Sequence, residues 1–216
     1  MTEELDIPVA ISARHVHLTQ SSIERLFGAG HRLQPRTPLG QPGQYAAQET
    51  VTLVGPRGQL PHVRVVGPPR EADQVEISRT DELTLGIDAP VRLSGQIEQT
   101  PGVTLIGPTG RLRLAHGAIL AQRHIHMNPE EAASLGLHDR QIVQVAVHGA
   151  GRELTFGEVA VRVSPHYRLE LHLDTDEGNA AGLHGGDRAQ LITPVRARAR
   201  LSSPAAAASA PAAPPH

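Results

Sequence analysis

The sequence contains no cysteine among its 216 residues. This absence excludes disulfide bonds, thiolate metal ligands and a cysteine nucleophile. It fits a reducing compartment, although exported proteins can also lack cysteine. No apolar run approaches the roughly 18 residues that a membrane-spanning helix requires, and the short, acidic N-terminus MTEELDIPVA does not resemble a signal peptide. We therefore expect a soluble cytoplasmic protein with no membrane partner.

Aromatic residues and net charge are also scarce. The 22 acidic and 20 basic residues give a formal net charge of −2, and only Phe27, Tyr45, Phe156 and Tyr167 are aromatic. Proteins that bind nucleic acids usually carry an excess of basic residues, and many of them stack bases on aromatic side chains. We therefore expect no nucleic-acid partner.

Glycine and proline are frequent, with 21 and 18 residues. Turn signals recur about every 8 to 12 residues, as they do in small barrels and sandwiches. Between the turns, apolar and polar residues alternate, which is the pattern of a strand with one buried face. Clear examples are Gln141–Gly149, Gly157–Ser164 and Tyr167–Asp176. These patterns predict a mainly β protein with two small β-barrels capped by short α-helices.

Two internal repeats support a duplicated architecture. ISARHVHLTQSSIERLFG, from Ile11, resembles LAQRHIHMNPEEAASLGL, from Leu120, at an offset of 109 residues. VTLVGPRGQL, from Val51, resembles VTLIGPTGRL, from Val103, at an offset of 52 residues. The longer repeat predicts two related halves, and the shorter one predicts a β-hairpin that is used twice.

Two short helices are predicted, each directly after a histidine pair. Thr19 is suited to cap the segment SSIERLFG, its hydroxyl accepting a hydrogen bond from the backbone N–H of Ser22 or Ile23. Asn128 is suited to cap a second helix with Pro129 at its first position, followed by two glutamates in the first turn.

The histidine pairs are the strongest chemical signal. Residues i and i+2 of a strand point to the same side, so His15 and His17 present two imidazoles together, as do His124 and His126. The apolar residue between each pair marks the buried face of the strand. Imidazole is a common ligand of Zn²⁺ and similar metals. Two pairs in matching RHxH contexts therefore predict metal binding rather than two polar surface strands.

Each pair needs a third protein ligand to complete a metal site. His172 lies on the polar face of a predicted strand and is a candidate partner of His124 and His126, with a solvated polar face as the alternative. Glu76 is a candidate for the other pair, although its spacing alone favours an exposed strand glutamate. The remaining histidines are expected to be surface or capping residues: His31, His62, His116, His138, His148, His166 and His184.

Several strings together resemble one family, the microcompartment-type phosphate propanoyltransferases, which are phosphotransacylases. The matching stretches are RHVHL, QPGQYAAQETVTLVGP, VRVVGPPR, QVEISRTD, APVRLSG, PGVTLIGPTG, RHIHM and HLDTDEGNAAG, which extend from Ile7 to about Gly182. The resemblance implies two β-barrels, one from residues 5–13 and 122–201 and the other from residues 14–121. The Ala/Pro/Ser composition of residues 202–216 independently predicts a disordered tail.

The resemblance also implies an activity and a set of site residues. The expected reaction is acyl-CoA + phosphate = acyl phosphate + CoA, with a propanoyl or acetyl group, at a site holding two Zn²⁺ or other divalent ions. Without cysteine, direct attack by phosphate replaces an acyl-cysteine route. One metal is assigned to His15, His17 and Glu76, and the other to His124, His126 and His172. Arg70 is assigned to phosphate as the catalytic residue, and Ser12, His172 and Asn179 are assigned to CoA.

The resemblance places the protein in propanediol degradation, with homo-oligomers and association with a bacterial microcompartment as further expectations. Encapsulated members often begin with an amphipathic helix. Here only about ten residues, without that pattern, precede the first predicted strand, so encapsulation would need another signal such as the Ala/Pro tail.

Three other functions use similar motifs. A metal-dependent hydrolase of the amidohydrolase type, acting on thioesters or amides, also places HxH on a strand, but its barrel typically needs about 250 residues and eight helices. A cupin-like barrel expects a glutamate shortly after HxH, which HVHLTQ lacks. A non-catalytic metal-binding scaffold would leave Arg70 without a role.

Overall fold

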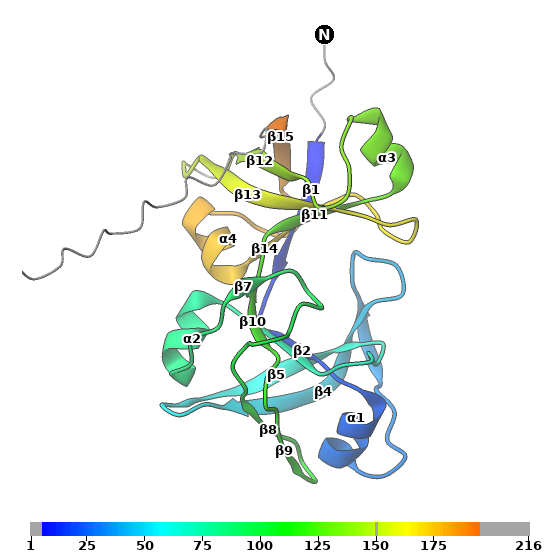
Figure 1. Ribbon diagram of the computed structural model, residues 1–216, viewed down its shortest axis with the longest axis vertical. Coiled ribbons are helices and arrows are strands. Elements are labelled where there is room, and N and C mark those ends of the chain that lie inside the picture. Colours follow the sequence, from blue (N-terminus) through cyan, green and yellow to red (C-terminus); the bar gives the residue numbers. More distant parts are fainter. Residues whose placement is uncertain (1–5, 150, 195–216) are drawn as a thin grey trace, which may run out of the picture.

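The protein consists of two stacked β-structures, seen in a computed structural model that describes residues 6–149 and 151–194 (Figure 1). The upper half in Figure 1 is a closed six-stranded barrel, and the lower half is a nine-stranded sheet. The barrel order is β1 (Asp6–Ser12), β14 (Glu170–Asp174), β11 (His124–Met127), β13 (Leu154–Val163), β12 (Ile142–Val147) and β15 (Arg188–Pro194).

The nine-stranded sheet is open rather than closed. Its order is β7 (Val91–Arg92), β10 (Ala118–Ala121), β6 (Gln74–Ile77), β2 (His15–His17), β5 (Gln59–Gly67), β4 (Tyr45–Val54), β8 (Thr104–Ile106) and β9 (Arg111–Arg113), with β3 (Pro35–Pro38) paired to β4. The prediction of a mainly β fold is confirmed. The second half is a half-barrel, because its two end strands, β7 and β9, do not pair with each other.

The chain crosses between the two halves at the histidine pairs. β1 lies in the barrel, and the chain then enters the open sheet as β2; β10 lies in the open sheet, and the chain then returns to the barrel as β11. Both HxH strands therefore start at the junction between the halves, as Figure 1 shows. The division into residues 5–13 with 122–201 and 14–121 as separate domains stays a prediction, and the predicted tail at 202–216 lies outside the described residues.

The two predicted helices are present with the predicted caps. Thr19 accepts a hydrogen bond from the Ser22 backbone N–H at the start of α1 (Gln20–Phe27). Asn128 accepts one from the Glu131 N–H at the start of α3 (Pro129–Ser134).

Two further helices were not predicted: α2 (Arg79–Leu85) and α4 (Thr175–Ala181). Each begins with a capping box, made by Ser78 with Asp81 in α2 and by Asp174 with Glu177 in α4. The predicted strand Tyr167–Asp176 was therefore too long, because only Glu170–Asp174 is a strand and the Asp174 side chain caps a helix instead. The spacing of a capping residue and an acid three positions later was a usable signal.

Each half has its own hydrophobic core. Val16 lies in one core and Ile125 in the other, both fully buried between the paired histidines. The two predicted hairpins are β4–β5 and β8–β9, and they pack side by side through β4 and β8. No helix within residues 6–149 and 151–194 has the length and apolar character needed to cross a bilayer.

Candidate active site

The first group of candidate ligands comes from β2 and β6, and we call it the β2 trio: His15, His17 and Glu76. The antiparallel register places His15 opposite Glu76. One ligand atom from each residue lies within 4.8 Å of the others. His17 and Glu76 are buried, and His15 is half-buried. The structure thus brings the histidine pair and the predicted third ligand together.

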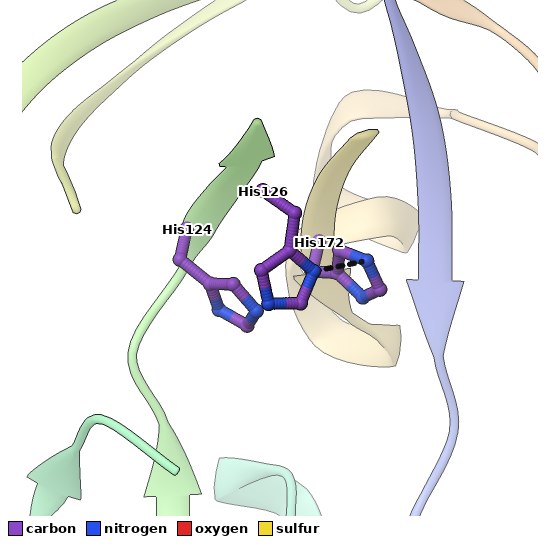
Figure 2. A group of neighbouring side chains, drawn as sticks. All are labelled: His124, His126 and His172. Carbon is purple, nitrogen blue, oxygen red and sulfur yellow. Dashed lines mark hydrogen bonds between the residues drawn. The ribbon is translucent and has the colours of Figure 1, made fainter. Parts of the chain in front are cut away.

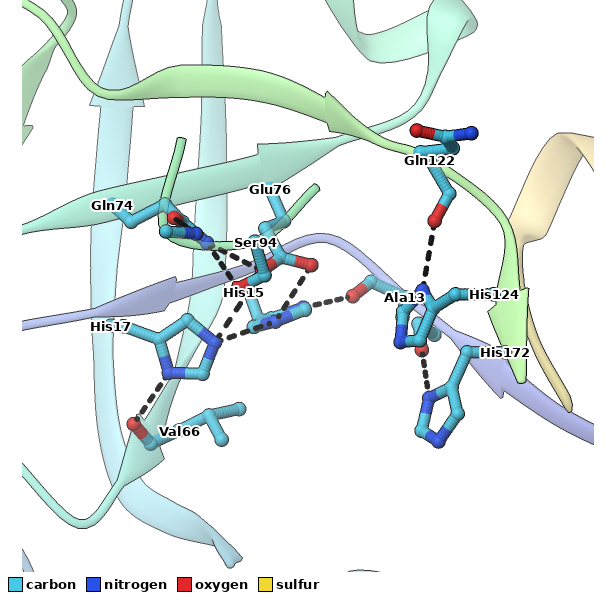
Figure 3. Close-up of polar contacts among 12 residues, drawn as sticks. Ala13, His15, His17, Val66, Gln74, Glu76, Ser94, Gln122, His124 and His172 are labelled. Carbon is cyan, nitrogen blue, oxygen red and sulfur yellow. Dashed lines mark hydrogen bonds and ion pairs between the residues drawn. The ribbon is translucent and has the colours of Figure 1, made fainter. Parts of the chain in front are cut away.

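Hydrogen bonds orient both imidazoles of the β2 trio (Figure 3). His15 Nδ1 donates to the Ala13 carbonyl at 2.8 Å, and His17 Nδ1 donates to the Val66 carbonyl at 3.3 Å. The two Nε2 atoms are then left without protons and face each other at 3.2 Å. Two nitrogen lone pairs repel at that distance unless a cation or a proton lies between them. This tautomer and orientation suit metal coordination.

The carboxylate of Glu76 is supported by neighbouring donors (Figure 3). The Gln74 side-chain amide and the Ser94 hydroxyl donate to Glu76 Oε1 at 2.6 and 2.9 Å. Its oxygens lie 3.5 Å from His15 Nε2 and 3.6 Å from His17 Nε2. Burial would raise the pKa of Glu76, yet His15 and His17 hold this pKa well below its usual value. The group is therefore an anionic ligand at neutral pH.

The second group comes from β11 and β14, and we call it the β11 trio: His124, His126 and His172 (Figure 2). His124 lies opposite His172 in the antiparallel register, and the three ligand atoms lie within 4.8 Å of one another. His124 Nδ1 donates to the Gln122 carbonyl at 2.8 Å, which matches His15 and Ala13 in the first trio. His126 Nε2 is buried and has no hydrogen-bond partner among the described residues, so a further group, such as a metal, fits this site.

Burial keeps the imidazoles of His17, His124 and His126 neutral at neutral pH. Loss of hydration lowers the pKa of His17 and of His124 to about 4, and it lowers the pKa of His126 to about 2, with the neighbouring imidazoles adding to the effect. A neutral imidazole has the lone pair that a metal needs. One trio offers two imidazoles with a carboxylate and the other offers three imidazoles, and both are donor sets that Zn²⁺ accepts.

Both trios line one cavity of about 470 Å³ between the two halves. Arg70 lines the same cavity, where Arg70 Nη1 donates to the Ser94 hydroxyl at 3.0 Å. Ser12 also lines it, and Ser12 Oγ lies 3.4 Å from His172 Nδ1. Asn179 is different: it is exposed on α4 and does not line this cavity. Apart from Asn179, the expected site residues therefore meet in one place.

Sequence reasoning missed four residues near the trios. Glu170 Oε2 lies 2.8 Å from His172 Nε2, and Gln41 Nε2 donates to the same carboxylate at 3.0 Å. Arg162 and Tyr167 line the cavity on the barrel side. The alternation in β14 was the only signal for Glu170, and no local motif marked the other three.

One predicted surface histidine has a defined partner. His31 Nε2 lies 2.7 Å from the buried carboxylate of Glu49, which also accepts hydrogen bonds from the Gln34 backbone N–H. His31 stacks on Phe27 as well. It therefore anchors the segment after α1, away from the trios.

Comparisons with known proteins agree on one family. The sequence profile of the phosphate propanoyltransferase family matches residues 8–184. The chain is 58% identical to a phosphate propanoyltransferase of Citrobacter freundii over 179 residues, which are 83% of this chain and 85% of that protein. It is 55% identical to the Salmonella typhimurium enzyme of that name over 176 residues, 82% and 83% of the two chains. It is 50% identical to the Thermotoga maritima enzyme over 192 residues, 89% and 91% of the two chains.

Proposed function

Because this chain belongs to the phosphate propanoyltransferase family, we propose that it transfers a propanoyl or acetyl group between coenzyme A and phosphate at a site with two bound metals. The observation that carries this proposal is the meeting of two ligand trios and Arg70 in one cavity. A phosphotransacylase must bring together a thioester and an inorganic anion. A cavity between two halves, with polar groups from both, suits that task.

The donor atoms of the two trios support metal binding. The β2 trio would hold one ion and the β11 trio a second one, with Zn²⁺ favoured by the imidazole-rich donor sets. Bound Zn²⁺ would act as a Lewis acid toward the thioester carbonyl and would stabilise the departing CoA thiolate. The chain's own contribution is to fix the imidazoles through Ala13, Gln122 and Val66, so that their lone pairs face the cavity.

Arg70 would bind the attacking phosphate. Burial lowers the pKa of Arg70, and the negative charge of Glu76 opposes this effect, so the guanidinium keeps its charge at neutral pH. Planar guanidinium groups bind phosphate through paired hydrogen bonds. A phosphate oxygen then forms a bond to the acyl carbon, the carbon–sulfur bond breaks, and the electron pair leaves with the CoA thiolate.

Coenzyme A is proposed to approach along β1 and β14. Ser12, the last residue of β1, and His172, in the middle of β14, both line the cavity from these neighbouring strands. Asn179, exposed on α4 just after β14, would contact a part of CoA that extends outside the cavity. Participation in propanediol degradation, microcompartment association and homo-oligomer formation remain predictions, the last being testable by light scattering of the purified protein.

The test is release of free CoA thiol from a short acyl-CoA series, with and without phosphate. We expect phosphate-dependent release that stops with a chelator and returns with Zn²⁺. Release without phosphate would instead indicate a thioester hydrolase. No release from protein with two bound metals per chain would indicate a non-catalytic scaffold.

Arg70→Ala tests the phosphate assignment within the same assay. The apparent KM for phosphate should rise about 10- to 100-fold, because the lost hydrogen bonds are charge-assisted, while the KM for acyl-CoA changes little. Arg70→Lys keeps the charge without the planar fork and should give an intermediate value. An unchanged phosphate KM in Arg70→Ala would remove Arg70 from this role.

A further inference from the structure

Arg162 is a second arginine in the cavity, on the side opposite Arg70 in the fold. It lies on β13 of the barrel and pairs in parallel register with His126, whereas Arg70 follows β5 of the open sheet. Arg162 is half-buried and lines the cavity. Burial lowers the pKa of Arg70, and the positive charge of Arg162 lowers it further. The cavity lining therefore includes one arginine that follows β5 of the open sheet and one from β13 of the barrel.

Among residues 6–149 and 151–194, no oxygen accepts a hydrogen bond from the Arg162 side chain. Four arginines line the cavity. Arg14 pairs with Asp81 at 2.7 Å, and Arg64 donates to two backbone carbonyls at 3.0 and 2.8 Å. Within the described part of the chain, Arg162 makes no ion pair. Its guanidinium carbon lies 5.7 Å from the centre of the Tyr167 ring. A stacked guanidinium keeps its edge donors available for an anion.

Tyr167 fixes this arginine beside the β11 trio. The Tyr167 ring packs against the His126 ring with 4.1 Å between ring centres. The Tyr167 ring thus contacts both His126 and Arg162, which are neighbours in the register of β11 and β13. The contact with Tyr167 restricts the long Arg162 side chain before any ligand binds. Arg162 therefore loses less conformational entropy on binding than a free arginine would.

The fold itself does not require an arginine at this position. β5 in the open sheet corresponds to β13 in the barrel: Val65 pairs with Val16 as Val161 pairs with Ile125. The residue after Val65 is Val66, which stands where the barrel has Arg162. The equivalent strand position in the other half is thus occupied by an apolar residue. Because the fold does not need a charge there, we look for a functional reason for Arg162.

We propose that Arg162 and Arg70, one from each half of the molecule, bind the same phosphate group, which is inorganic phosphate in one direction and the phosphoryl end of the acyl phosphate in the other. This rests on the proposed function. Two guanidiniums with open donors match a dianion, whose binding also relieves their mutual repulsion. Arg162 contacts phosphate oxygens that do not form the bond to the acyl carbon, so it orients the attacking oxygen.

The experiment compares three variants of the metal-loaded protein. Arg162→Val introduces the residue of the equivalent position in β5. Arg162→Lys keeps the charge and serves if the valine variant folds poorly. Arg168→Val removes one positive charge from the connection that follows β13, but Arg168 is exposed and does not line the cavity. Thermal unfolding and metal content are measured for each variant first.

Binding of inorganic phosphate is then measured by calorimetry, independently of turnover. Arg162→Val should weaken phosphate binding about tenfold or more, as expected for lost charge-assisted hydrogen bonds, with a smaller effect for Arg162→Lys and none for Arg168→Val. Because calorimetry does not depend on turnover, it tests phosphate binding by Arg162 even if the protein fails to transfer acyl groups. In active protein, the KM for phosphate should rise while the KM for acyl-CoA stays within about twofold.

Two results would overturn the proposal. If phosphate binding is unchanged and the KM for acyl-CoA rises, Arg162 binds the phosphates of CoA instead. If neither phosphate binding nor either KM changes in Arg162→Val, the arginine only supports packing around Tyr167.

Discussion

The two halves of this protein build the same ligand scaffold and complete it with different chemistry. In each half an HxH strand lies antiparallel to a short strand that supplies the third candidate ligand: His15 pairs with Glu76, and His124 pairs with His172. The third residue is therefore a carboxylate in the open sheet and an imidazole in the barrel. The Glu76 carboxylate gives the β2 trio an anionic donor, whereas the β11 trio offers only imidazoles.

The neighbouring residue changes together with the third ligand. Gln74 lies opposite His17, and Glu170 lies opposite His126. The amide of Gln74 donates to the Glu76 carboxylate, whereas the carboxylate of Glu170 interacts with the His172 imidazole. Each third ligand thus has a partner of complementary hydrogen-bonding character. The two trios therefore offer different donor sets, and we expect them to perform different tasks in the proposed reaction.

The largest expected effect comes from removing one buried histidine from either trio. His17→Ala and His126→Ala should each lower the metal content from two ions per chain to one. Acyl transfer should fall by about 100-fold or more, because a Lewis acid supplies several kcal/mol of transition-state stabilisation. Elemental analysis and the thiol-release assay measure the two quantities. If either variant keeps two metals or full activity, the altered trio does not hold a metal that the reaction needs. Exposed His184 provides the control through His184→Ala.

Exchanging the third ligands sharpens the comparison. Glu76→His would give two all-histidine trios, and His172→Glu would give two trios with a carboxylate. We expect both variants to keep two metals, since both donor sets suit Zn²⁺. Activity should fall about 10- to 100-fold, because the hydrogen-bonding partners at Gln74 and Glu170 no longer match. Wild-type activity in either variant would show that the charge difference between the trios is unimportant.

The free energy of unfolding of the metal-free protein should fall in acid. The barrel histidine His126 should contribute to this fall down to a lower pH than His17 of the open sheet. Unfolded histidines titrate near pH 6.5, whereas burial lowers the pKa of His17 to about 4 and of His126 to about 2 in the folded protein. The unfolded chain therefore binds more protons below about pH 6.5, and the free energy of unfolding falls as the pH falls. Each histidine contributes up to about 1.4 kcal/mol per pH unit.

Urea unfolding between pH 7.5 and 3.5 measures this dependence. His17→Asn should reduce the slope only down to about pH 4, and His126→Asn should reduce it at lower pH as well. His184→Asn, at an exposed side chain, should leave the slope unchanged. Equal slopes in all three variants would mean that the trios do not govern acid stability.

The smallest expected effect concerns the ion pairs at the two crossings. Arg14 pairs with Asp81, and Arg123 pairs with Glu177, both at 2.7 Å. Arg123 also lies over the Phe156 ring, 5.3 Å from its centre. Arg123→Ala should therefore lower the free energy of unfolding by about 2 kcal/mol, and Arg14→Ala by about 1 kcal/mol. Chemical denaturation checks the order. The reverse order would show that leaving the more buried Asp81 without its partner costs more than losing the ring contact.

Much of the fold could be predicted because its signals are local. Alternating polarity identified β12 and β13, and the repeated VTL segments identified both hairpins. The caps at Thr19 and Asn128 identified α1 and α3. α2 and α4 were missed because their capping boxes directly follow alternating strands, and the alternation was extended through them. One sheet closes and the other stays open, which depends on whether the first and last strands of each sheet pair. No local sequence pattern shows this pairing.

The sequence by itself determined the residue chemistry: the two HxH strands, the missing thiols, and the family resemblance carried by long ordered motifs. Strand periodicity fixes which side chains share a face, and that is a property of neighbouring residues. The tertiary structure alone decided that Glu76 and His172 stand at equivalent positions, that both trios open into one cavity, and that Arg162 and Arg70 line this cavity from different halves. These relations depend on the register between distant strands, which is set by the packing of two separate apolar cores.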